Sequence, residues 1–571
     1  MNLENLPKWA QELADKYVSG SASLFVLYGN VDDWVPLRDA RGLRFVSLSD
    51  FLKQAVFGTR DAVIQYDQGS GITINAEAAQ DFYRTVEAMD TVSGTAFSKR
   101  LPKNPADALL VIDRFIRTKA LGEEKKKASV AVVISFAHMV APRGELSFMN
   151  QEDFRTLITL QKWANDPAFA RSDVTVVLVT GSMQELNEGL VNNPFTAKIH
   201  VPLPDEDERL EFVRASQIPV QYQGLTQETF ARQANALSRA DIEVMLRQAQ
   251  RAGRLDLEFV SAKKKELIEK SCFGLLEFLE PRYTLDAVEG LSAAKARLRE
   301  DIQLIKKGCW DALPMGYLIC GPVGTGKTFL STCAIGELGI PCVQMLNFRS
   351  KWVGATEGNL EKILMTLRAL GPVGVIIDEA DAFMGNRGEE GDSGTSNRIF
   401  AQFASQMGDT KYRGKILWFL LTCRPDYLPV DIKRQGRVEV HIPLFYPQTP
   451  EEKAQLFVSL SGKVQWPVDP ADVDARWVEG KKLSGADIEA ILVSAKRKSF
   501  LGGGSQPKKL CLQQAAESFI PAASAAEVQY QELAAVVECT DLSFLPEAYR
   551  RADRAEILKE FNRLRAMLEL R

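Results

Sequence analysis

GPVGTGKT, at Gly321–Thr328, says more about the architecture of this 571-residue chain than any other segment of it. It fits the pattern G-x-x-x-x-G-K-[ST], and the apolar run Met315–Cys320 leads into it while the helix-compatible TFLSTCAIGEL follows. A strand, a glycine-rich loop and a helix in this order surround a phosphate with backbone N–H groups and a helix N-terminus. The predicted phosphate loop consists of Gly321, Pro322, Val323, Gly324, Thr325, Gly326, Lys327, Thr328 and Phe329.

A second stretch, VIIDEAD at Val375–Asp381, supplies the acids that such a loop requires. Its apolar run is typical of a strand buried on both faces, and it ends in Asp378 and Glu379. Ligands bind at the carboxyl ends of parallel strands, so these acids are expected at the same site. The alternative is a glycine-rich turn and an unrelated acidic surface turn, and the presence of both stretches in this order argues against it.

Each charged side chain has an expected role at this site. Lys327 is expected to reach the β- and γ-phosphates of ATP. Thr328 and Asp378 are expected to bind Mg²⁺, and Glu379 to polarise the attacking water.

The segment from Tyr283 to Ser499 resembles the ATPase cassette of the AAA family, within the AAA+ class. The resemblance implies that ATP and Mg²⁺ are the cofactors, that the reaction is ATP hydrolysis, and that the fold is a P-loop NTPase-like α/β sandwich with a small helical lid. Besides the two stretches above, it rests on VEGL at Val288–Leu291, KWVG at Lys351–Gly354, LLTCRPD at Leu420–Asp426, RQGR at Arg434–Arg437 and LSGADI at Leu483–Ile488.

The resemblance also implies roles outside the two nucleotide motifs. Arg434 and Arg437 would be arginine fingers, reaching the neighbouring subunit's site and stabilising charge on the γ-phosphate. Without this context, two arginines three residues apart are a solvated turn. Gly485 and Ala486, in the lid, would lie near the nucleotide, although the serine and aspartate of LSGADI also approximate a capping box.

One position departs from the family pattern. Cys423 stands where the family usually has an asparagine that senses the γ-phosphate and helps to orient water. A thiol is only a weak hydrogen-bond donor. Either Thr422 substitutes for that asparagine, or hydrolysis is slow and tightly gated.

KWVG lies where AAA proteins project a loop into the central channel of their ring. By this resemblance, Trp352 and Val353 form a pore loop that grips an extended polypeptide. A tryptophan buried in the core is the alternative, but the polar surroundings NFRSKWVGATEGN are typical of a loop. The glycine-rich segment Gly385–Asn397 could be a second channel loop.

Composition limits the class of protein. With 46% hydrophobic and 25% charged residues, usage is that of a soluble globular protein, and a net charge of −4 gives no bulk reason to bind nucleic acid or anionic lipid. Eight cysteines without a C-x-x-C pair and three histidines support neither a zinc site nor a disulfide framework. Without a signal-like segment or an 18-residue apolar span, we expect a cytoplasmic protein with no membrane partner.

The first half of the chain resembles the second half in sequence but lacks its nucleotide-binding motifs. LSRADIE at Leu237–Glu243 parallels LSGADIE at Leu483–Glu489, and IHVPLP at Ile199–Pro204 parallels VHIPLF at Val440–Phe445. Similar offsets in the same order indicate a tandem duplication in which every catalytic charge of the first copy is lost. In this register Asp378 corresponds to Ser135, Glu379 to Phe136, Arg434 to Asn193 and Arg437 to Thr196.

The first copy has lost its phosphate loop as well, because LFVLYG at Leu24–Gly29 enters NVDDW. Asp32 and Asp33 would repel a triphosphate by about 4 kcal/mol for each charge pair at an effective dielectric near 20. We therefore expect no ATP binding there. Further strands are expected at Ala62–Tyr66, Val130–Phe136 and Val174–Thr180.

The predicted fold class is α/β, with two tandem P-loop NTPase-like sandwiches, each followed by a helical lid. Ile557, Phe561, Leu564 and Leu568 recur at helical spacing in the last segment, which indicates a helix used for packing or for a partner. The expected domains are a degenerate AAA-like domain at 1–270 (core 21–204, lid 205–270), a linker at 271–282, an active core at 283–449, a lid at 450–540 and a C-terminal extension at 541–571.

These expectations combine into a homo-oligomeric ring, a hexamer by resemblance, that hydrolyses ATP with Lys327, Glu379, Arg434 and Arg437. It would remodel, unfold or thread a protein substrate. An ATP-gated scaffold or switch that recruits a partner without translocation is the alternative: Trp352 favours the motor, whereas Cys423 and the degenerate first cassette fit the switch. The acidic balance argues against a third possibility, a nucleic-acid motor.

Overall fold

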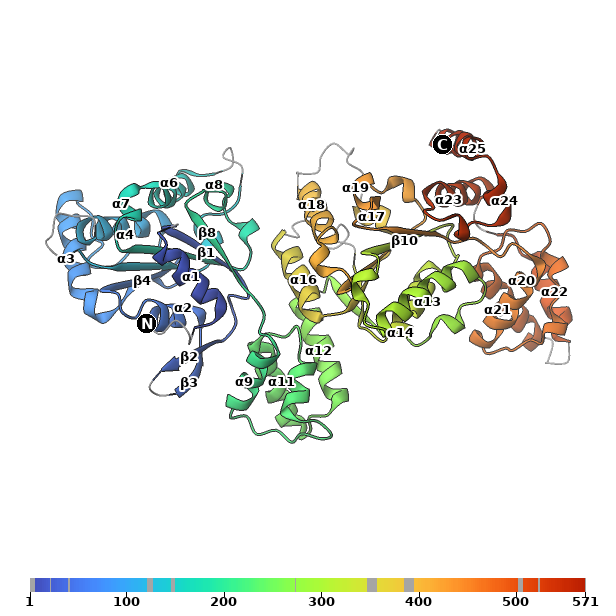
Figure 1. Cartoon of the computed structure of the whole chain (residues 1–571), viewed down its shortest axis with the longest axis horizontal. Helices are drawn as coiled ribbons and strands as arrows, with labels where there is room; N and C mark the ends of the chain where they lie inside the picture. Colours follow the sequence, from blue (N-terminus) through green and yellow to red (C-terminus); the bar gives the residue numbers. More distant parts are fainter. Residues whose placement is uncertain are drawn as a thin grey trace. The chain divides into compact units, whose positions relative to one another are not determined.

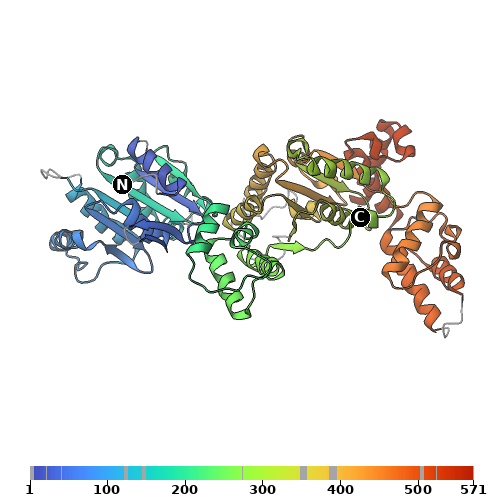
Figure 2. The ribbon, with the colours of Figure 1, turned by 60° about the horizontal axis from the view of Figure 1, so that its bottom comes forward.

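The computed structural model divides into two compact units, Met1–Ser271 with Thr356–Ala369, and Cys272–Ala355 with Leu370–Arg571. Each unit contains a six-stranded sheet with helices on its faces (Figures 1 and 2). Within the described part of the chain, no helix is both long enough and apolar enough to cross a membrane. The described residues are 6–20, 22–39, 42–120, 127–144, 149–272, 274–346, 357–384, 395–501, 507–521 and 524–569.

The first sheet is built from buried, β-branched runs. Its strands are β1 (Leu24–Gly29), β4 (Ala62–Asp67), β5 (Gly71–Ile74), β6 (Val130–Ile134), β7 (Val174–Thr180) and β8 (Thr196–Val201), and β2 (Val35–Asp39) and β3 (Gly42–Val46) form a separate hairpin. The order is β5-β4-β6-β7-β1-β8, in which β5 pairs antiparallel with β4 and the other neighbours pair in parallel. The hairpin follows β1, at the place where the second half has its glycine-rich loop.

Helices cover both faces of this sheet because alternate strand residues point to opposite sides. Leu24 and Val26 face the core formed with α3, α4 and α6, whereas Phe25 and Leu27 face α1 and α2. Four further helices, α9 to α12, form the lid. The helices are α1 (Lys8–Val18), α2 (Leu48–Phe51), α3 (Ala76–Ser93), α4 (Pro105–Lys119), α5 (Ala137–Val140), α6 (Gln151–Asn165), α7 (Pro167–Ala170), α8 (Glu188–Val191), α9 (Glu206–Ala215), α10 (Gln227–Gln233), α11 (Arg239–Ala252) and α12 (Leu257–Ser271).

The second sheet repeats this arrangement. Its strands are β9 (Leu276–Leu279), β10 (Gly316–Cys320), β11 (Cys342–Met345), β12 (Val373–Ile377), β13 (Ile416–Thr422) and β14 (Val440–Pro443). The order is β14-β10-β13-β12-β11-β9, with β9 antiparallel to β11. The antiparallel edge strand precedes β10 here, whereas β5 follows β4 in the first sheet. Part of the predicted linker therefore forms β9.

The helices of the second unit form separate groups. α13 and α14 cover one face of the sheet, Phe403 of α18 packs on Trp418 at the other face, and α20 to α22 form a lid with its own core. α23 and α25 pack on each other at the C-terminus (Figure 1). The helices of this unit are α13 (Ser292–Lys306), α14 (Lys327–Leu338), α17 (Ala380–Met384), α18 (Thr395–Met407), α19 (Val430–Lys433), α20 (Pro450–Lys463), α21 (Gly485–Leu501), α22 (Lys508–Ser518), α23 (Ala525–Glu538), α24 (Glu547–Arg551) and α25 (Arg554–Glu569). α16 (Glu357–Leu370) follows β11 in the chain but is assigned, up to Ala369, to the first unit.

The predicted fold class, two tandem α/β sandwiches each with a helical lid, is confirmed. One detail differs from expectation. The strand predicted to reach Phe136 ends at Ile134, because Phe136 adopts a left-handed conformation with a φ of 51°. In the last helix, Phe561 and Leu564 are buried against α23, which favours the packing interpretation of its apolar face.

Candidate functional site

The predicted phosphate loop lies between β10 and α14, and two of its glycines are required by close approach. Gly321 has a φ of 147°, and a Cβ on it would lie 2.2 Å from the carbonyl oxygen of Leu444. Gly324 has a φ of 81°, and its Cβ would lie 2.6 Å from the Cβ of Ser484. Larger residues at either position would therefore force the backbone apart.

Lys327 is the first residue of α14 and is only 9% exposed. Its ammonium group donates to the carbonyl oxygens of Gly321 and Pro322, both at 2.9 Å, and to the Sγ of Cys423 at 3.1 Å. The cation predicted to meet the phosphates is thus held at the loop itself. Cys423, the departure from the family pattern, contacts this lysine directly.

The two predicted magnesium ligands are adjacent. The hydroxyl of Thr328 donates to Oδ2 of Asp378 at 2.8 Å, and Oδ1 of Asp378 accepts from the backbone N–H of Glu379 at 2.9 Å. Hydroxyl and carboxylate oxygens are the donors that Mg²⁺ prefers, so this pair fits the ion. Glu379 has an exposed side chain and a φ of 48°, and this left-handed turn separates β12 from α17.

Thr422, one of the two alternatives for the sensor, is committed elsewhere. It is 1% exposed, its hydroxyl donates to Oδ1 of Asp381 at 2.6 Å, and it accepts from the backbone N–H of Arg424 at 2.8 Å. Its single donor is therefore already used. This geometry favours the other alternative, in which hydrolysis is slow and gated.

The lid contacts the loop through the residues that the sequence singled out. The backbone N–H of Gly485 donates to the carbonyl oxygen of Gly324 at 3.1 Å, and the Cβ of Ala486 lies 3.9 Å from the position of a Cβ on Gly324. Ser484 and Asp487 also cap α21, with the Ser484 hydroxyl donating to the Asp487 carboxylate at 2.7 Å. Helix capping and contact with the loop occur together.

Other loop residues have neighbours that the sequence did not indicate. The backbone N–H of Val323 donates to Oε1 of Gln531 at 3.2 Å, and its carbonyl oxygen accepts from the hydroxyl of Tyr446 at 2.7 Å. The exposed ring of Phe329 lies 5.9 Å from the ring of Tyr283. Gln531 belongs to no recognisable motif, so no sequence signal pointed to it. Thr325 closes the loop on itself by donating to the carbonyl oxygen of Pro322 at 2.9 Å.

The predicted arginine fingers lie in the turn between α19 and β14. Arg434 is exposed, and Arg437 donates to the carbonyl oxygen of Asp431 at 2.7 Å. Burial and the neighbouring charge of Arg434 lower the pKa of Arg437. Their role in a neighbouring subunit stays a prediction. The predicted pore-loop residues Trp352 and Val353 lie outside the described residues.

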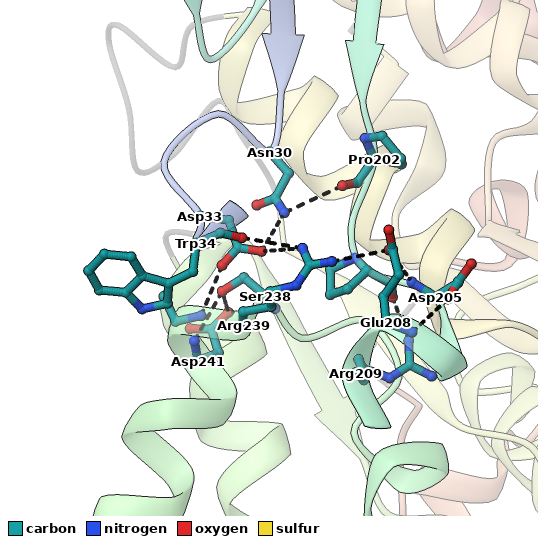
Figure 3. Close-up of polar contacts among 12 residues, drawn as sticks. Asn30, Asp33, Trp34, Pro202, Asp205, Glu208, Arg209, Ser238, Arg239 and Asp241 are labelled. Atoms are coloured by element: carbon teal, nitrogen blue, oxygen red, sulfur yellow. Dashed lines mark hydrogen bonds and ion pairs between the residues drawn. The ribbon is translucent and has the colours of Figure 1, made fainter. Parts of the chain in front are cut away.

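In the first cassette, the place of the phosphate loop is taken by a polar network (Figure 3). The side chain of Asp33 is 2% exposed and accepts from the backbone N–H of Ala240 at 2.9 Å, at the start of α11. Asn30 donates to the same carboxylate at 2.9 Å, and Arg239 lies 3.6 Å from it. Burial raises the pKa of the Asp33 carboxyl, against the opposing effect of these donors.

Arg239 joins the core of this cassette to its lid. Its side chain is 7% exposed, donates to the carbonyl oxygen of Trp34 at 3.3 Å and lies 3.3 Å from the carboxylate of Glu208 in α9. Arg239 occupies the position in LSRADI that Gly485 occupies in LSGADI. Of the two aspartates expected to repel a phosphate, Asp33 is thus buried against the lid, whereas the side chain of Asp32 is exposed.

The acidic strand of the second cassette also has a degenerate counterpart. Phe136 keeps the left-handed backbone of Glu379, with φ values of 51° and 48°, although its exposed ring has no catalytic chemistry. His138 Nδ1 lies 3.1 Å from the hydroxyl of Thr180, which repeats the contact between Asp381 and Thr422. The two cassettes thus share this backbone conformation and this side-chain contact, although the first cassette lacks the carboxylates.

Comparison with known proteins finds three family models along the chain. Residues 2–202 match the model "AAA+ chaperone, N-terminal Rossmann-like domain" and residues 207–273 match "AAA+ chaperone, second helical domain". Residues 317–446 match "ATPase family associated with various cellular activities (AAA)".

Individual relatives are more distant. The chain is 25% identical over 405 residues to a cell division cycle protein 48 homolog of Archaeoglobus fulgidus, covering 65% of this chain and 54% of that protein. It is 29% identical over 248 residues to the ATP-dependent zinc metalloprotease FtsH 3 of Sphaerobacter thermophilus (42% and 50%), and 28% identical over 264 residues to fidgetin-like protein 1 of Xenopus laevis (44% and 40%). The chain therefore spans about half the length of these curated relatives.

Proposed function

Since the chain belongs to the AAA+ class and carries an AAA ATPase domain in its second half, we propose that it hydrolyses ATP and uses the energy to remodel, unfold or thread a protein substrate. The observation that carries this proposal is the cluster of Lys327, Thr328, Asp378 and Glu379 at the carboxyl ends of β10 and β12. The corresponding positions of the first cassette lack this set, so the second cassette is the proposed site of hydrolysis.

Each residue has a defined task in this proposal. Lys327 releases its loop carbonyls to bind the β- and γ-phosphates, and the N–H groups of the loop bind the remaining phosphate oxygens. Thr328 and Asp378 would hold Mg²⁺, which when bound neutralises charge on the phosphates. Glu379, whose side chain is exposed beside them, orients the attacking water.

Ring assembly is the second part of the proposal. Arg437 and Arg434 lie in a turn that holds them away from hydrogen bonds to the phosphate loop of their own chain, as far as the described residues show. Fingers placed in this way act on the site of a neighbouring subunit. We propose a homo-oligomer, a hexamer, in which the first cassette serves assembly or the docking of a partner.

A protein substrate is supported by two of the family models, whose descriptions name AAA+ chaperones. The switch remains the competing proposal, because the contact of Cys423 with Lys327 and the engaged hydroxyl of Thr422 fit slow, gated hydrolysis. A ring that only recruits a partner needs ATP binding but no grip on a polypeptide. A substitution in the proposed pore loop therefore distinguishes the motor from the switch.

The test combines two variants. Glu379→Gln should bind ATP and hydrolyse it at least about a hundredfold more slowly, and proteins captured on it supply a substrate for the next step. Trp352→Ala should keep parental ATP hydrolysis but fail to make that substrate protease-sensitive in the presence of ATP. Losing an aromatic contact of about 1.5–3 kcal/mol weakens the grip by an order of magnitude or more. If Glu379→Gln hydrolysed ATP at the parental rate, the proposed ATPase mechanism would be wrong. If Trp352→Ala remodelled the substrate as well as the parental protein, the threading proposal would be wrong and the switch would be the remaining proposal.

A further inference from the structure

Three consecutive residues of helix α23, Tyr530, Gln531 and Glu532, contact three segments around the nucleotide site. These segments are the loop after β13, the phosphate loop and the lid. The helix packs on β14 and on the 3₁₀ turn Pro425–Tyr427, beyond the lid core formed by α20 to α22. Neighbouring residues on a helix point about 100° apart, so one helix laid along the site faces several walls at once. The three α23 residues themselves lie outside every motif discussed above.

Tyr530 meets the loop that follows β13. Its ring is 2% exposed, and its hydroxyl donates to Oδ2 of Asp426 at 2.7 Å and accepts from Nη2 of Arg424 at 3.1 Å. The guanidinium carbon of Arg424 also lies 4.6 Å from the centre of the Tyr530 ring and 3.9 Å from that of Tyr427. Burial and the charge of Asp426 raise the pKa of Tyr530, so its hydroxyl stays a donor at neutral pH.

This loop is directly coupled to the residues of the phosphate site. Arg424 donates its backbone N–H to Thr422, which in turn donates to Asp381 of the acidic stretch. The intervening residue, Cys423, contacts Lys327. The Tyr530 hydroxyl therefore holds the three-residue segment Thr422–Arg424, which contacts both Lys327 and, through Asp381, the helix that follows the acidic strand.

Gln531 meets the phosphate loop. Its Oε1 accepts from the N–H of Val323, while Tyr446 donates to the carbonyl oxygen of the same residue. The side chain of Val323 is 58% exposed, so these two hydrogen bonds, rather than packing, hold this part of the loop. Without Gln531, Val323 would lose one of these two hydrogen bonds.

Glu532 and α25 complete the arrangement. Glu532 is 5% exposed and pairs with Lys482 at 2.5 Å, two residues before the capping serine of the lid helix α21. On the other side of the helix, the Tyr530 ring stacks on Phe561 of α25 at 5.1 Å with an interplanar angle of 14°. Helix α23, which packs on α25, therefore contacts the loop, the lid and the segment after β13.

We propose that Tyr530 and Gln531 are positioning residues for ATP hydrolysis at the second cassette. Gln531 holds the phosphate loop in its binding shape, and Tyr530 holds the segment that sets Lys327 and Asp381. The inference rests on the proposed ATPase function. It predicts that the two residues affect different kinetic constants, which a merely structural role would not produce.

The test uses the full chain and steady-state hydrolysis over a range of ATP concentrations. Tyr530→Phe keeps the stacking on Phe561 and removes the hydroxyl, and it should lower kcat about tenfold with KM changed by less than about twofold, because a hydrogen bond to a charged group is lost. Gln531→Leu should raise KM, and the Kd of a fluorescent ATP analogue, about five- to tenfold. Asp426→Leu, which removes the acceptor of this hydrogen bond, should also lower kcat.

Tyr66→Phe is the matched control, because it removes a buried tyrosine hydroxyl that donates to the carbonyl oxygen of Lys103 in the first cassette. It should leave kcat and KM unchanged. Parental kinetics in Tyr530→Phe and Gln531→Leu would overturn the inference, as would losses that only follow the fraction of folded protein. A parental chain that binds ATP without hydrolysing it would refute the proposed function instead, and the analogue affinity of Gln531→Leu would still decide the role of Gln531.

Discussion

The two cassettes share one strand order, but the contact between the α/β core and the helical lid is made by different groups in each. In the second cassette, the lid meets a glycine-rich loop through a backbone hydrogen bond from Gly485 to Gly324. In the first, the buried Asp33 and Arg239 meet at the same joint (Figure 3). At the start of α11 a buried carboxylate thus takes the place of the backbone carbonyl that the start of α21 contacts in the second cassette. The comparison shows that the same strand order accommodates two kinds of contact between core and lid, one between backbone groups and one between buried charged side chains.

Backbone geometry has been retained more faithfully than side-chain chemistry. Phe136 and Glu379 share a left-handed conformation, which costs a non-glycine residue about 1–2 kcal/mol. Phe136 has no catalytic use for it. The strain therefore belongs to the way a parallel strand turns into the following helix in this fold, and a left-handed φ at Glu379 is not by itself evidence of catalysis.

The largest effect that would test this comparison is the loss of ATP binding in Lys327→Ala. If the first cassette binds no nucleotide, removing one lysine from the second should leave the whole chain without an ATP site. Calorimetric titration with Mg²⁺ and ATP checks this, with the exposed Lys411→Ala as the control that should bind normally. Stoichiometric binding that persists in Lys327→Ala would show that the network around Asp33 does not exclude ATP.

The next effect concerns residues that the first cassette has lost at a proposed subunit boundary. Arg437→Ala should lower hydrolysis by about 10³- to 10⁵-fold, the range for a finger arginine. Mixing Arg437→Ala with Lys327→Ala subunits should restore part of the activity, because each contributes what the other lacks. Native mass spectrometry would verify the mixed assemblies, and verified mixtures without any rescue would contradict a shared site.

A moderate effect is expected at the joint of the first cassette. Asp33→Ala leaves the buried Arg239 without one of its two acidic neighbours and should destabilise the contact of α11 with the core by about 3–5 kcal/mol. Hydrogen exchange should then accelerate at the start of α11, while ATP binding by the second cassette is unchanged. Asp32→Ala is the matched control, because Asp32 is the neighbouring residue and its side chain is exposed. Equal exchange in both variants would mean that Asp33 does not hold the lid.

The sequence predicted those features that short segments determine by themselves. The glycine-rich loop, the apolar strand before Asp378 and the capping pair of α21 each lie within a few residues, and the structure contains all three. It could not predict the pairing of Asp33 with Arg239 or of Val323 with Gln531, because both partners belong to segments about 200 residues apart that follow no shared period. β9 was missed for a similar reason: a four-residue edge strand is defined by its partner β11 rather than by its own pattern.

The smallest expected effect comes from removing the hydroxyl of Thr180 or of Thr422, which make equivalent contacts in the two cassettes. Thr180→Val removes the hydroxyl next to His138 and should lower the free energy of unfolding by about 1 kcal/mol. ATP hydrolysis should stay at the parental rate, because we expect no hydrolysis in the first cassette. Thr422→Val removes the equivalent hydroxyl next to Asp381 and should lower kcat about tenfold, since that hydrogen bond ties the acidic stretch to the segment beside Lys327. Steady-state ATPase assays on both variants, with hydrogen exchange along β7 to register the loss of stability, provide the measurement. A fall in kcat for Thr180→Val as large as that for Thr422→Val would show that the first cassette takes part in turnover, and the contrast between a silent and an active cassette would then fail.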